Sequence, residues 1–244
     1  MYLHRIHTVT FLSFRAYNTD NQLITDTINV EFMEPAIEEF NLLYPNYLIS
    51  SIDGSVEVVE TCPRSDLDFR RLVVTGCMGY VFPREFAADS VAFYGKANSR
   101  PPMMYNSDGI FLAEIKGRKC LFICELKSSF ASAQIARAKE QIIGTLLRLK
   151  AQMSILQSNP NWEYHGVIVS YAPTEAQLIA VNKLTSRDGW FSRYLYVRGH
   201  RLIDSETADK YYRPLALPDI NIHYVAVPNR QTEFQMDLQS LLAL

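Results

Sequence analysis

A short apolar run that ends in charged residues constrains the fold of this chain more than any other feature. Residues 120–124 read CLFIC and are apolar at every position, a pattern typical of a central strand covered on both faces. Because the side chains of a strand alternate between its faces, Glu125 and Lys127 point to one face and Leu126 points to the other. A carboxylate and an ammonium group at the end of such a strand cost free energy unless partners compensate them. We therefore expect a buried sheet with a charged site at one end.

The preceding residues extend this strand into a hairpin. Residues 106–129 read NSDGIFLAEIKGRKCLFICELKSS, which predicts two short strands joined by a tight turn, with Asp108 entering the first strand. Carboxylates such as Asp108 and Glu125 are oxygen ligands of the kind that Mg²⁺ takes, and Lys127 would then stand beside a reacting water. A simpler interpretation stays open, with an ordinary Glu/Lys ion pair at a strand end and an aspartate in the turn before Gly109.

An aspartate at a strand start, a hairpin, a buried strand ending in Glu-x-Lys and a long helix follow one another in this chain. This order resembles the core of the PD-(D/E)XK nuclease superfamily over roughly residues 100–175. Ser107 stands where many members of that family have a proline, at a position that is loose in the family. The resemblance implies an α/β fold with a restriction-endonuclease-like core, in which helices flank a mixed central β-sheet, together with an N-terminal β-rich elaboration.

The resemblance also implies roles for the charged residues. Asp108 and Glu125 would hold one or two Mg²⁺ or Mn²⁺ ions, with the backbone carbonyl of Leu126 as a further ligand. The metal would lower the pKa of a bound water and neutralise the charge that develops on the phosphate. Lys127 would be catalytic by steadying the attacking hydroxide or an oxygen of the transition state.

A long amphipathic helix is predicted directly after this motif, over residues 131–157. Apolar residues repeat there at three- and four-residue steps and form one buried stripe: Ile135, Ala138, Ile142, Leu146, Leu149, Met153 and Leu156. A narrower stripe beside it contains Gln134, Ala138, Gln141 and Thr145. By the family resemblance, Gln141 would join the catalytic residues by orienting water or contacting phosphate. The alternative is a solvent-exposed glutamine, because helices use glutamine freely.

A predicted helix that begins at Glu34 and stops before Pro45 carries two further acids, Glu34 and Glu38, one turn apart. The resembled family often takes an additional acid from a helix that precedes the core. Acids in the first turn of a helix are also favourable against its macrodipole. Neither residue is therefore assigned to the site from the sequence.

The remaining segments complete an organisation that we expect to be one compact domain. Residues 1–100 would form a helix and β-rich elaboration packed on the core, residues 101–230 the nuclease core, and residues 231–244 a tail containing a short amphipathic helix suited to self-association. The other predicted elements are a hairpin over residues 2–15 and 22–32, strands at VEVVE, RRLVVTG and GYVF, strands over 164–171 and 220–227, and a helix over 174–184. Aromatic and basic residues interleave in residues 189–201, which favours either nucleic-acid contact or packing over the sheet.

Composition indicates a globular protein, since 48% of the residues are hydrophobic and 20% are charged. No apolar run approaches the ~18 residues that span a bilayer, and the first residues lack the pattern of a secretory signal, so we expect no membrane partner and a cytoplasmic location. The four cysteines, Cys62, Cys77, Cys120 and Cys124, are spaced irregularly without a C-x-x-C pair. This favours free thiols over a zinc or iron-sulfur site.

Charge is distributed unevenly along the chain, although its net value is only −2. Acids dominate residues 1–60 and bases dominate residues 116–150, within which Arg148 and Lys150 fit a solvated helix face. Positive potential around the predicted site would suit the phosphate backbone of a nucleic acid.

Beside these features, the resemblance to the PD-(D/E)XK superfamily implies a metal-dependent endonuclease that hydrolyses phosphodiester bonds of DNA in a restriction, repair or antiviral defence system. No G-x-x-x-x-G-K-[ST] motif occurs, so the chain itself would not use ATP. Two alternatives stay open: an RNA-directed nuclease, which shares the site chemistry, and a non-catalytic nucleic-acid-binding or assembly protein that keeps the nuclease fold. The resemblance also allows a homodimer or a subunit of a larger complex.

Overall fold

The computed structural model describes residues 16–17, 23–24, 34–61, 70–91, 104–158, 161–185, 201–203, 220–228 and 231–243. The chain divides into two units, Met1–Phe32 and Met33–Leu244. In the first unit, β1 (Ala16–Tyr17) pairs antiparallel with β2 (Leu23–Ile24). The predicted hairpin over residues 2–15 and 22–32 otherwise lies outside the described residues, and so does the aromatic and basic segment before Arg201.

A mixed sheet forms the centre of the second unit and has eight strands within the described residues. Its order is β10-β4-β5-β6-β7-β9-β8, and β3 also pairs with β4. The strands are β3 (Ser50–Val59), β4 (Arg71–Val81), β5 (Gly109–Ile115), β6 (Arg118–Lys127), β7 (Glu163–Tyr171), β8 (Arg201–Ile203), β9 (Ile220–Val227) and β10 (Glu233–Asp237). β5 is antiparallel to β6, whereas β6, β7 and β9 run parallel. The predicted α/β class with a mixed sheet flanked by helices is confirmed.

The hairpin of β5 and β6 has the predicted tight turn. Lys116 and Gly117 have φ values of 51° and 74°, and a two-residue loop with positive φ at both positions matches the right-handed twist of the flanking strands. This turn pairs Ile115 with Arg118 and Gly109 with Cys124. Asp108 consequently lies directly before β5, where its N–H donates to the carbonyl of Cys124 at 3.0 Å.

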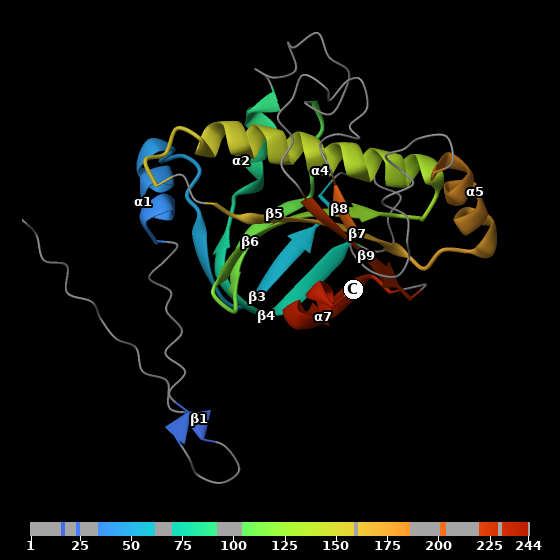
Figure 1. Cartoon of the computed structure of the whole chain (residues 1–244), viewed down its shortest axis with the longest axis horizontal. Coiled ribbons are helices and arrows are strands. Elements are labelled where there is room, and N and C mark those ends of the chain that lie inside the picture. Colours follow the sequence, from blue (N-terminus) through green and yellow to red (C-terminus); the bar gives the residue numbers. More distant parts are fainter. Residues whose placement is uncertain are drawn as a thin grey trace, which may run out of the picture. The chain divides into compact units, whose positions relative to one another are not determined.

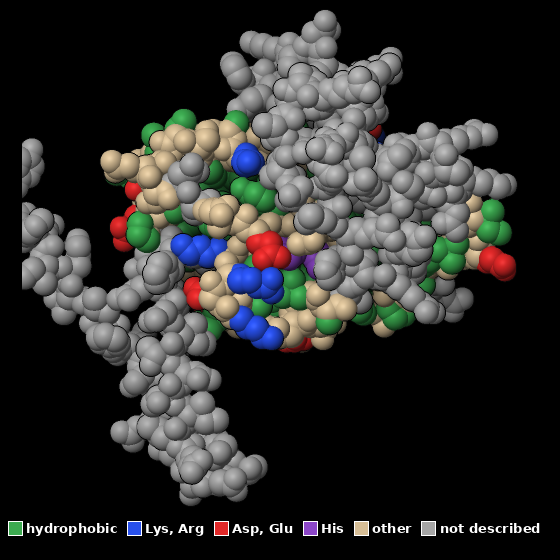
Figure 2. All heavy atoms as spheres, viewed as in Figure 1, with side chains coloured by type: hydrophobic (Ala, Val, Ile, Leu, Met, Phe, Trp, Pro, Cys, Tyr) green, Lys and Arg blue, Asp and Glu red, His purple; other side chains and the backbone are tan. Residues whose placement is uncertain are grey.

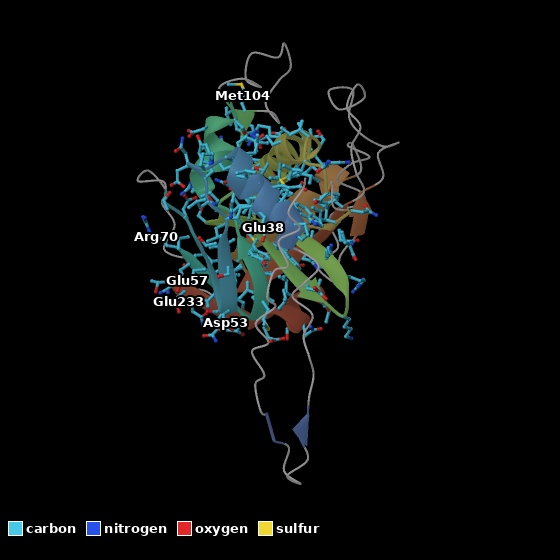
Figure 3. The ribbon with its side chains drawn as sticks, turned by 90° about the vertical axis from the view of Figure 1, so that its left-hand side faces the viewer. Glu38, Asp53, Glu57, Arg70, Met104 and Glu233 are labelled. Atoms are coloured by element: carbon cyan, nitrogen blue, oxygen red, sulfur yellow. The ribbon has the colours of Figure 1, made fainter. Side chains whose placement is uncertain are left out.

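The segments RRLVVTG and GYVF, predicted as two strands, form the single strand β4. A side chain at Gly79 would place its Cβ 2.1 Å from the carbonyl oxygen of Leu112, so glycine lets β4 approach β5 closely and the pattern of two runs is misleading. β10, which the sequence pattern does not predict, runs parallel to β4. Figure 3 shows Glu57 of β3 and Glu233 of β10 near one another, and Arg71 of β4 donates to both. The sheet therefore continues across the boundary predicted at residue 100.

Helices lie on both faces of this sheet (Figure 1). The described helices are α1 (Glu34–Leu43), α2 (Arg84–Asp89), α4 (Ser132–Met153), α5 (Glu175–Thr185) and α7 (Leu238–Leu242). α4 crosses one face, with α1 and α5 near its two ends, and α7 lies at the other face (Figure 1). The helices predicted from Glu34, over 131–157 and over 174–184 are confirmed, although α4 ends at Met153. None of the described helices is long and apolar enough to cross a membrane.

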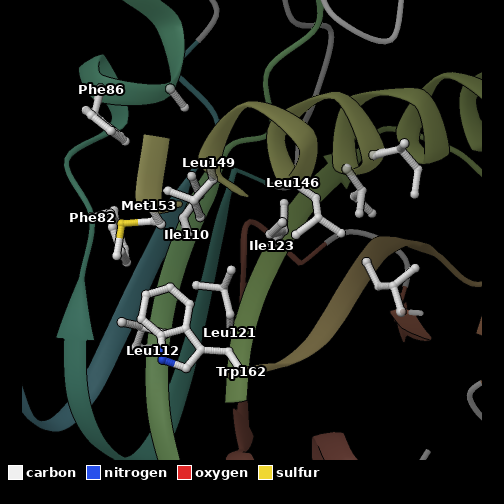
Figure 4. Close-up of a cluster of buried hydrophobic side chains, with 14 of the residues drawn as sticks. Phe82, Phe86, Ile110, Leu112, Leu121, Ile123, Leu146, Leu149, Met153 and Trp162 are labelled. Atoms are coloured by element: carbon white, nitrogen blue, oxygen red, sulfur yellow. The ribbon is translucent and has the colours of Figure 1, made fainter. Parts of the chain in front are cut away.

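Two hydrophobic cores separate these layers. Between the sheet and α4, side chains such as Leu121 and Ile123 of β6 meet Leu146 and Leu149 of α4 (Figure 4). On the other face, Phe122, Cys124 and Leu126 of β6 belong to a second core, which α7 also joins. Each buried large apolar side chain stabilises the fold by roughly 1.5–3 kcal/mol. The prediction that β6 is covered on both faces is confirmed.

Candidate active site

The end of β6 carries the two charges that the motif predicts on one face. Glu125 and Lys127 project to the α4 side of the sheet, and Lys127 Nζ donates to Glu125 Oε1. The same ammonium group donates to Gln141 Oε1 of α4 at 2.6 Å. Only 8% of the Lys127 side chain and 1% of the Glu125 side chain are exposed. The structure thus brings together three of the predicted site residues from two elements.

Asp108 lies beside them, held against β6. Its Oδ2 atom accepts the backbone N–H of Leu126 at 2.7 Å, while its Oδ1 atom lies 3.9 Å from Nη2 of Arg84. The side chain of Leu126 points away into the second core. The predicted metal-ligand set of Asp108, Glu125 and the Leu126 backbone is therefore gathered at one strand end, beside Arg84, to which the sequence analysis assigns no role.

The two carboxyl groups are in an environment that disfavours their negative charges. Burial raises the pKa of Asp108 to about 6, and the carboxylate of Glu60 raises it too, against the N–H of Leu126 and the cations Lys127 and Arg84. Burial and then the charge of Asp108 raise the pKa of Glu125 well above its usual value, while Lys127 lowers it. Carboxylates crowded in this way are characteristic of functional sites.

One oxygen of this group has no hydrogen-bond partner. Glu125 Oε2 is buried, and none of the described residues donates a hydrogen bond to it. A buried acceptor of this kind calls for a ligand, an ion or water. Together with Asp108 it provides hard oxygen donors, so the residues present fit a divalent cation such as Mg²⁺ or Mn²⁺.

α4 also holds the segment that leads into Asp108. Gln141 Nε2 donates to the carbonyl of Asn106 at 2.8 Å, and Thr145 Oγ1 accepts the N–H of Ser107 at 3.0 Å. Arg148 Nη2 donates to the carbonyl of Tyr105 at 2.7 Å and to the side chain of Asn106. These three α4 residues lie four and three positions apart, hence on one face of the helix. They position the backbone directly before the aspartate.

The location of Arg148 differs from the predicted solvated helix face. Arg148 is fully buried, with 0% of the residue exposed, whereas Lys150 is exposed as the predicted solvated face requires. Besides the contacts above, Arg148 Nε donates to Ser90 Oγ at 3.0 Å. The prediction of a solvated arginine was wrong because charge patterns alone do not show that one backbone carbonyl and two polar side chains from distant segments accept hydrogen bonds from this guanidinium group.

A cavity of about 250 Å³ opens beside Asp108. Its walls come from β3, β4, α2 and β5, and they include Val58, Phe82, Arg84 and Glu57. The strands come close there, since a Cβ at Gly109 would lie 2.9 Å from both methyl groups of Val58. The site is thus continuous with a partly apolar cavity.

An acid from outside the predicted motif acts on this site. Glu60, which directly follows β3, raises the pKa values of both Asp108 and Glu125. Of the two acids considered on α1, Glu38 is exposed (Figure 3), and the side chain of Glu34 lies outside the described residues. Glu60 is one acid in the run VEVVE, and nothing in that local pattern distinguishes it. Only the packing of β3 near β5 brings its charge to the site.

A second polar cluster lies at the opposite ends of β6 and β7. Ligand-type atoms of Cys120, Glu163 and His165 lie within 4.8 Å of one another, and Figure 2 shows basic, acidic and histidine side chains gathered on one face. His165 Nδ1 lies 2.9 Å from His223 Nε2, and its Nε2 lies 3.4 Å from Glu163. Arg118 also pairs with Glu163, at 3.2 Å. The guanidinium group of Arg118 therefore offsets the charge of the Glu163 carboxylate without any metal.

Among the cysteines within the described residues, Cys77, Cys120 and Cys124 are free and buried. Burial raises the pKa of the Cys77 thiol to about 12 and that of Cys120 to about 11. High pKa values keep these groups as thiols, which are poor nucleophiles and poor metal ligands.

Comparisons with known proteins assign no family to this arrangement. Neither a scan against protein-family models, nor a search of curated proteins, nor a search of solved structures found a match.

Proposed function

We propose that this chain is a metal-dependent nuclease with a restriction-endonuclease-like fold, which hydrolyses phosphodiester bonds of DNA in a restriction, repair or antiviral defence system. One observation carries the proposal. Asp108, Glu125, Lys127 and Gln141 converge at one end of the β5–β6 hairpin, where Glu125 keeps a buried oxygen that none of the described residues satisfies. This combination of two carboxylates, an ammonium group and an amide suits hydrolysis assisted by a cation.

Asp108, Glu125 and the backbone carbonyl of Leu126 would hold Mg²⁺ or Mn²⁺. When bound, the cation would acidify a water molecule and offset negative charge at the phosphate. The N–H of Leu126 fixes the orientation of Asp108, so this carboxylate is already positioned before any ion binds. Such positioning lowers the reorganisation that binding and reaction require.

Lys127 would contact the reacting oxygen atoms. An ammonium group has three donors, of which one is directed to Glu125 and one to Gln141. The remaining donor can bind a water or a phosphate oxygen and stabilise charge that develops there. Gln141 is itself held by the carbonyl of Asn106, so a continuous chain of contacts fixes the ammonium group.

The first test is cleavage of supercoiled plasmid, labelled single-stranded DNA and labelled RNA with EDTA, Mg²⁺ or Mn²⁺. We expect metal-dependent cleavage of DNA that falls by at least ~100-fold in Asp108→Asn and in Glu125→Gln. Glu114→Gln, which neutralises another acid on β5 of the same hairpin, should cut at the wild-type rate. Cleavage that persists in EDTA or in both site variants would contradict the proposal, and preferential cutting of RNA would favour the RNA-directed alternative.

A second candidate is a non-catalytic nucleic-acid-binding or assembly protein that keeps the fold. The observation in its favour is that Lys127 pairs with Glu125 and Arg84 approaches Asp108, which partly neutralises the carboxylates without any metal. Calorimetric titration with Mn²⁺ separates the two. Binding that Asp108→Asn abolishes supports the nuclease, whereas absence of both Mn²⁺ binding and cleavage supports the second candidate.

A further inference from the structure

Arg84 has an unused hydrogen-bonding edge next to the candidate active site. Its Nη2 atom lies 3.9 Å from Asp108 Oδ1, beyond hydrogen-bond distance. Its Nη1 atom is buried and has no hydrogen-bond partner among the described residues. The side chain as a whole is 35% exposed and lines the cavity beside Asp108. A guanidinium group in this state lacks an acceptor that it could bind with good geometry.

The second observation is the space in front of this edge. Arg84 and Asp108 both line the cavity of about 250 Å³, together with apolar residues of β3 and β5. Liquid water occupies about 30 Å³ per molecule, so the cavity has room for a phosphate group with its attached sugar. Apolar walls suit the carbon atoms of such a sugar, and the polar end of the cavity adjoins the predicted metal ligands.

The other cation of the site has less to offer a phosphate group. Two of the three donors of Lys127 are directed to Glu125 and Gln141, whereas the Nη1 atom of Arg84 has no partner among the described residues. An arginine fork matches two oxygen atoms of a phosphate better than a lysine does. We propose that Arg84 is a phosphate-binding residue of this site, in addition to Lys127, and that its cavity with Asp108 receives a phosphodiester group of the substrate strand. This inference deepens the proposed nuclease function and rests on it.

The charges around the cavity add a condition to this binding. Glu57 and Glu85 also line the cavity, and Arg71 already pairs with Glu57. With Asp108 and Glu125 close by, a free phosphate meets negative potential until a divalent cation offsets it. Phosphate binding through Arg84 therefore depends on the cation being present.

The test is equilibrium binding of thymidine 3′,5′-bisphosphate, measured by calorimetry on the full chain with saturating Ca²⁺ and with EDTA. We expect the wild type to bind it only with Ca²⁺, and Arg84→Met to weaken binding by about tenfold or more. Arg84→Lys should bind more weakly than the wild type because it loses the fork. Arg118→Met removes an arginine at the opposite end of β6, where it pairs with Glu163, and it should bind as the wild type does.

Titration with Mn²⁺ distinguishes phosphate binding from a merely structural role. Arg84→Met should bind Mn²⁺ as tightly as the wild type or more tightly, because the substitution removes a positive charge 3.9 Å from Asp108. Parallel loss of Mn²⁺ binding, bisphosphate binding and thermal stability would overturn the inference. If Arg84→Met does not fold, Arg84→Lys decides, and wild-type affinity in that variant would equally overturn it.

These outcomes are separable from those of the proposed function. If the wild type cleaves DNA and Arg84→Met binds the bisphosphate normally, the nuclease proposal is supported and the phosphate site at Arg84 is contradicted. If the wild type cuts no nucleic acid but binds the bisphosphate through Arg84, the phosphate site is supported and the nuclease proposal is contradicted. Absence of bisphosphate binding to the wild type with Ca²⁺ also overturns the inference.

Discussion

Folding disfavours the ionised form of two carboxyl groups, those of Asp108 and Glu125. Their side chains are 5% and 1% exposed, and each is near the other as well as near Glu60. A raised carboxyl pKa means that the folded chain binds a proton more tightly than the unfolded chain does. The metal-free protein therefore gains stability from protonation at this site.

The first prediction concerns the pH dependence of stability in EDTA. The pKa of Asp108 rises from 3.8 to about 6 on folding, so its stabilising protonation is fully present below pH ~4 and is lost as the pH rises through ~6. We expect Asp108→Asn to be more stable than the wild type at pH 7, by up to ~3 kcal/mol, and the difference to shrink at pH 4. Urea denaturation at several pH values measures the stability difference at pH 7 and its decrease towards pH 4.

The control for this prediction is Glu114→Gln, which removes an acid from β5, the strand that follows Asp108, outside the site. It should leave the wild-type pH dependence unchanged. Addition of Mn²⁺ should stabilise the wild type at pH 7 and have little effect on Asp108→Asn. Identical pH profiles for the wild type and Asp108→Asn would show that Asp108 titrates normally.

At the scale of elements, α4 supports the site and also covers the sheet. Its apolar stripe packs on β5, β6 and β7, and the neighbouring stripe of Gln141, Thr145 and Arg148 binds the backbone of residues 105–107. The position of Asp108 thus depends on a helix that is distant in sequence. A rigid helix is a more precise support than a loop.

The second prediction tests this support through Arg148→Met, which keeps much of the side-chain volume but removes the donors. We expect the free energy of unfolding to fall by about 2–4 kcal/mol, because the carbonyl of Tyr105 and the side chain of Asn106 lose a buried charged donor. Mn²⁺ affinity should fall too, as the segment before Asp108 loosens. Urea denaturation and calorimetry measure the two effects.

Lys150→Met is the matched control, since Lys150 lies two residues further along α4 and is exposed. It should change stability by less than ~1 kcal/mol and leave Mn²⁺ affinity unaltered. An Arg148→Met protein as stable as this control would mean that the buried contacts contribute little.

At the scale of the whole second unit, one sheet joins segments from all three predicted regions, which are residues 1–100, 101–230 and 231–244. β3 and β4 come from residues before 100, β5 to β7 from the predicted core, and β10 from the tail. The tail helix α7 is present, and its Leu238 and Leu241 are buried in the second core at 2% and 0% exposure. These leucines therefore pack inside the chain, where the sequence pattern suggested a surface for self-association.

The third prediction compares two leucine substitutions. Leu241→Ala should lower the free energy of unfolding by about 2–5 kcal/mol, because it leaves a cavity in the second core. Leu42→Ala on α1 should change it by less than ~0.5 kcal/mol, since Leu42 is 85% exposed. Thermal and urea denaturation check both. Equal effects of the two substitutions would mean that α7 does not hold the second core together.

The sequence by itself determined the local elements around the site and the faces that they present. The apolar run before Glu125 predicted a doubly covered β6, the Lys-Gly turn predicted the hairpin, and the stripe of α4 predicted both its buried face and the neighbourhood of Gln141. These predictions succeed because periods of 2 and 3.6 residues and the φ of a turn are properties of neighbouring residues. The end of α4 was missed because Leu156 continues the apolar pattern in a turn after the helix.

Only the tertiary structure decided which distant groups surround Asp108. Arg84 comes from α2, after β4, and Glu60 follows β3, which packs beside Gly109. Arg148 of α4 holds the residues that lead into Asp108. None of these contacts has a local sequence signal, because each joins segments that are far apart along the chain. The sequence therefore predicts the ligands of the site, whereas three-dimensional packing determines its electrostatics, its cavity and the arginine that faces it.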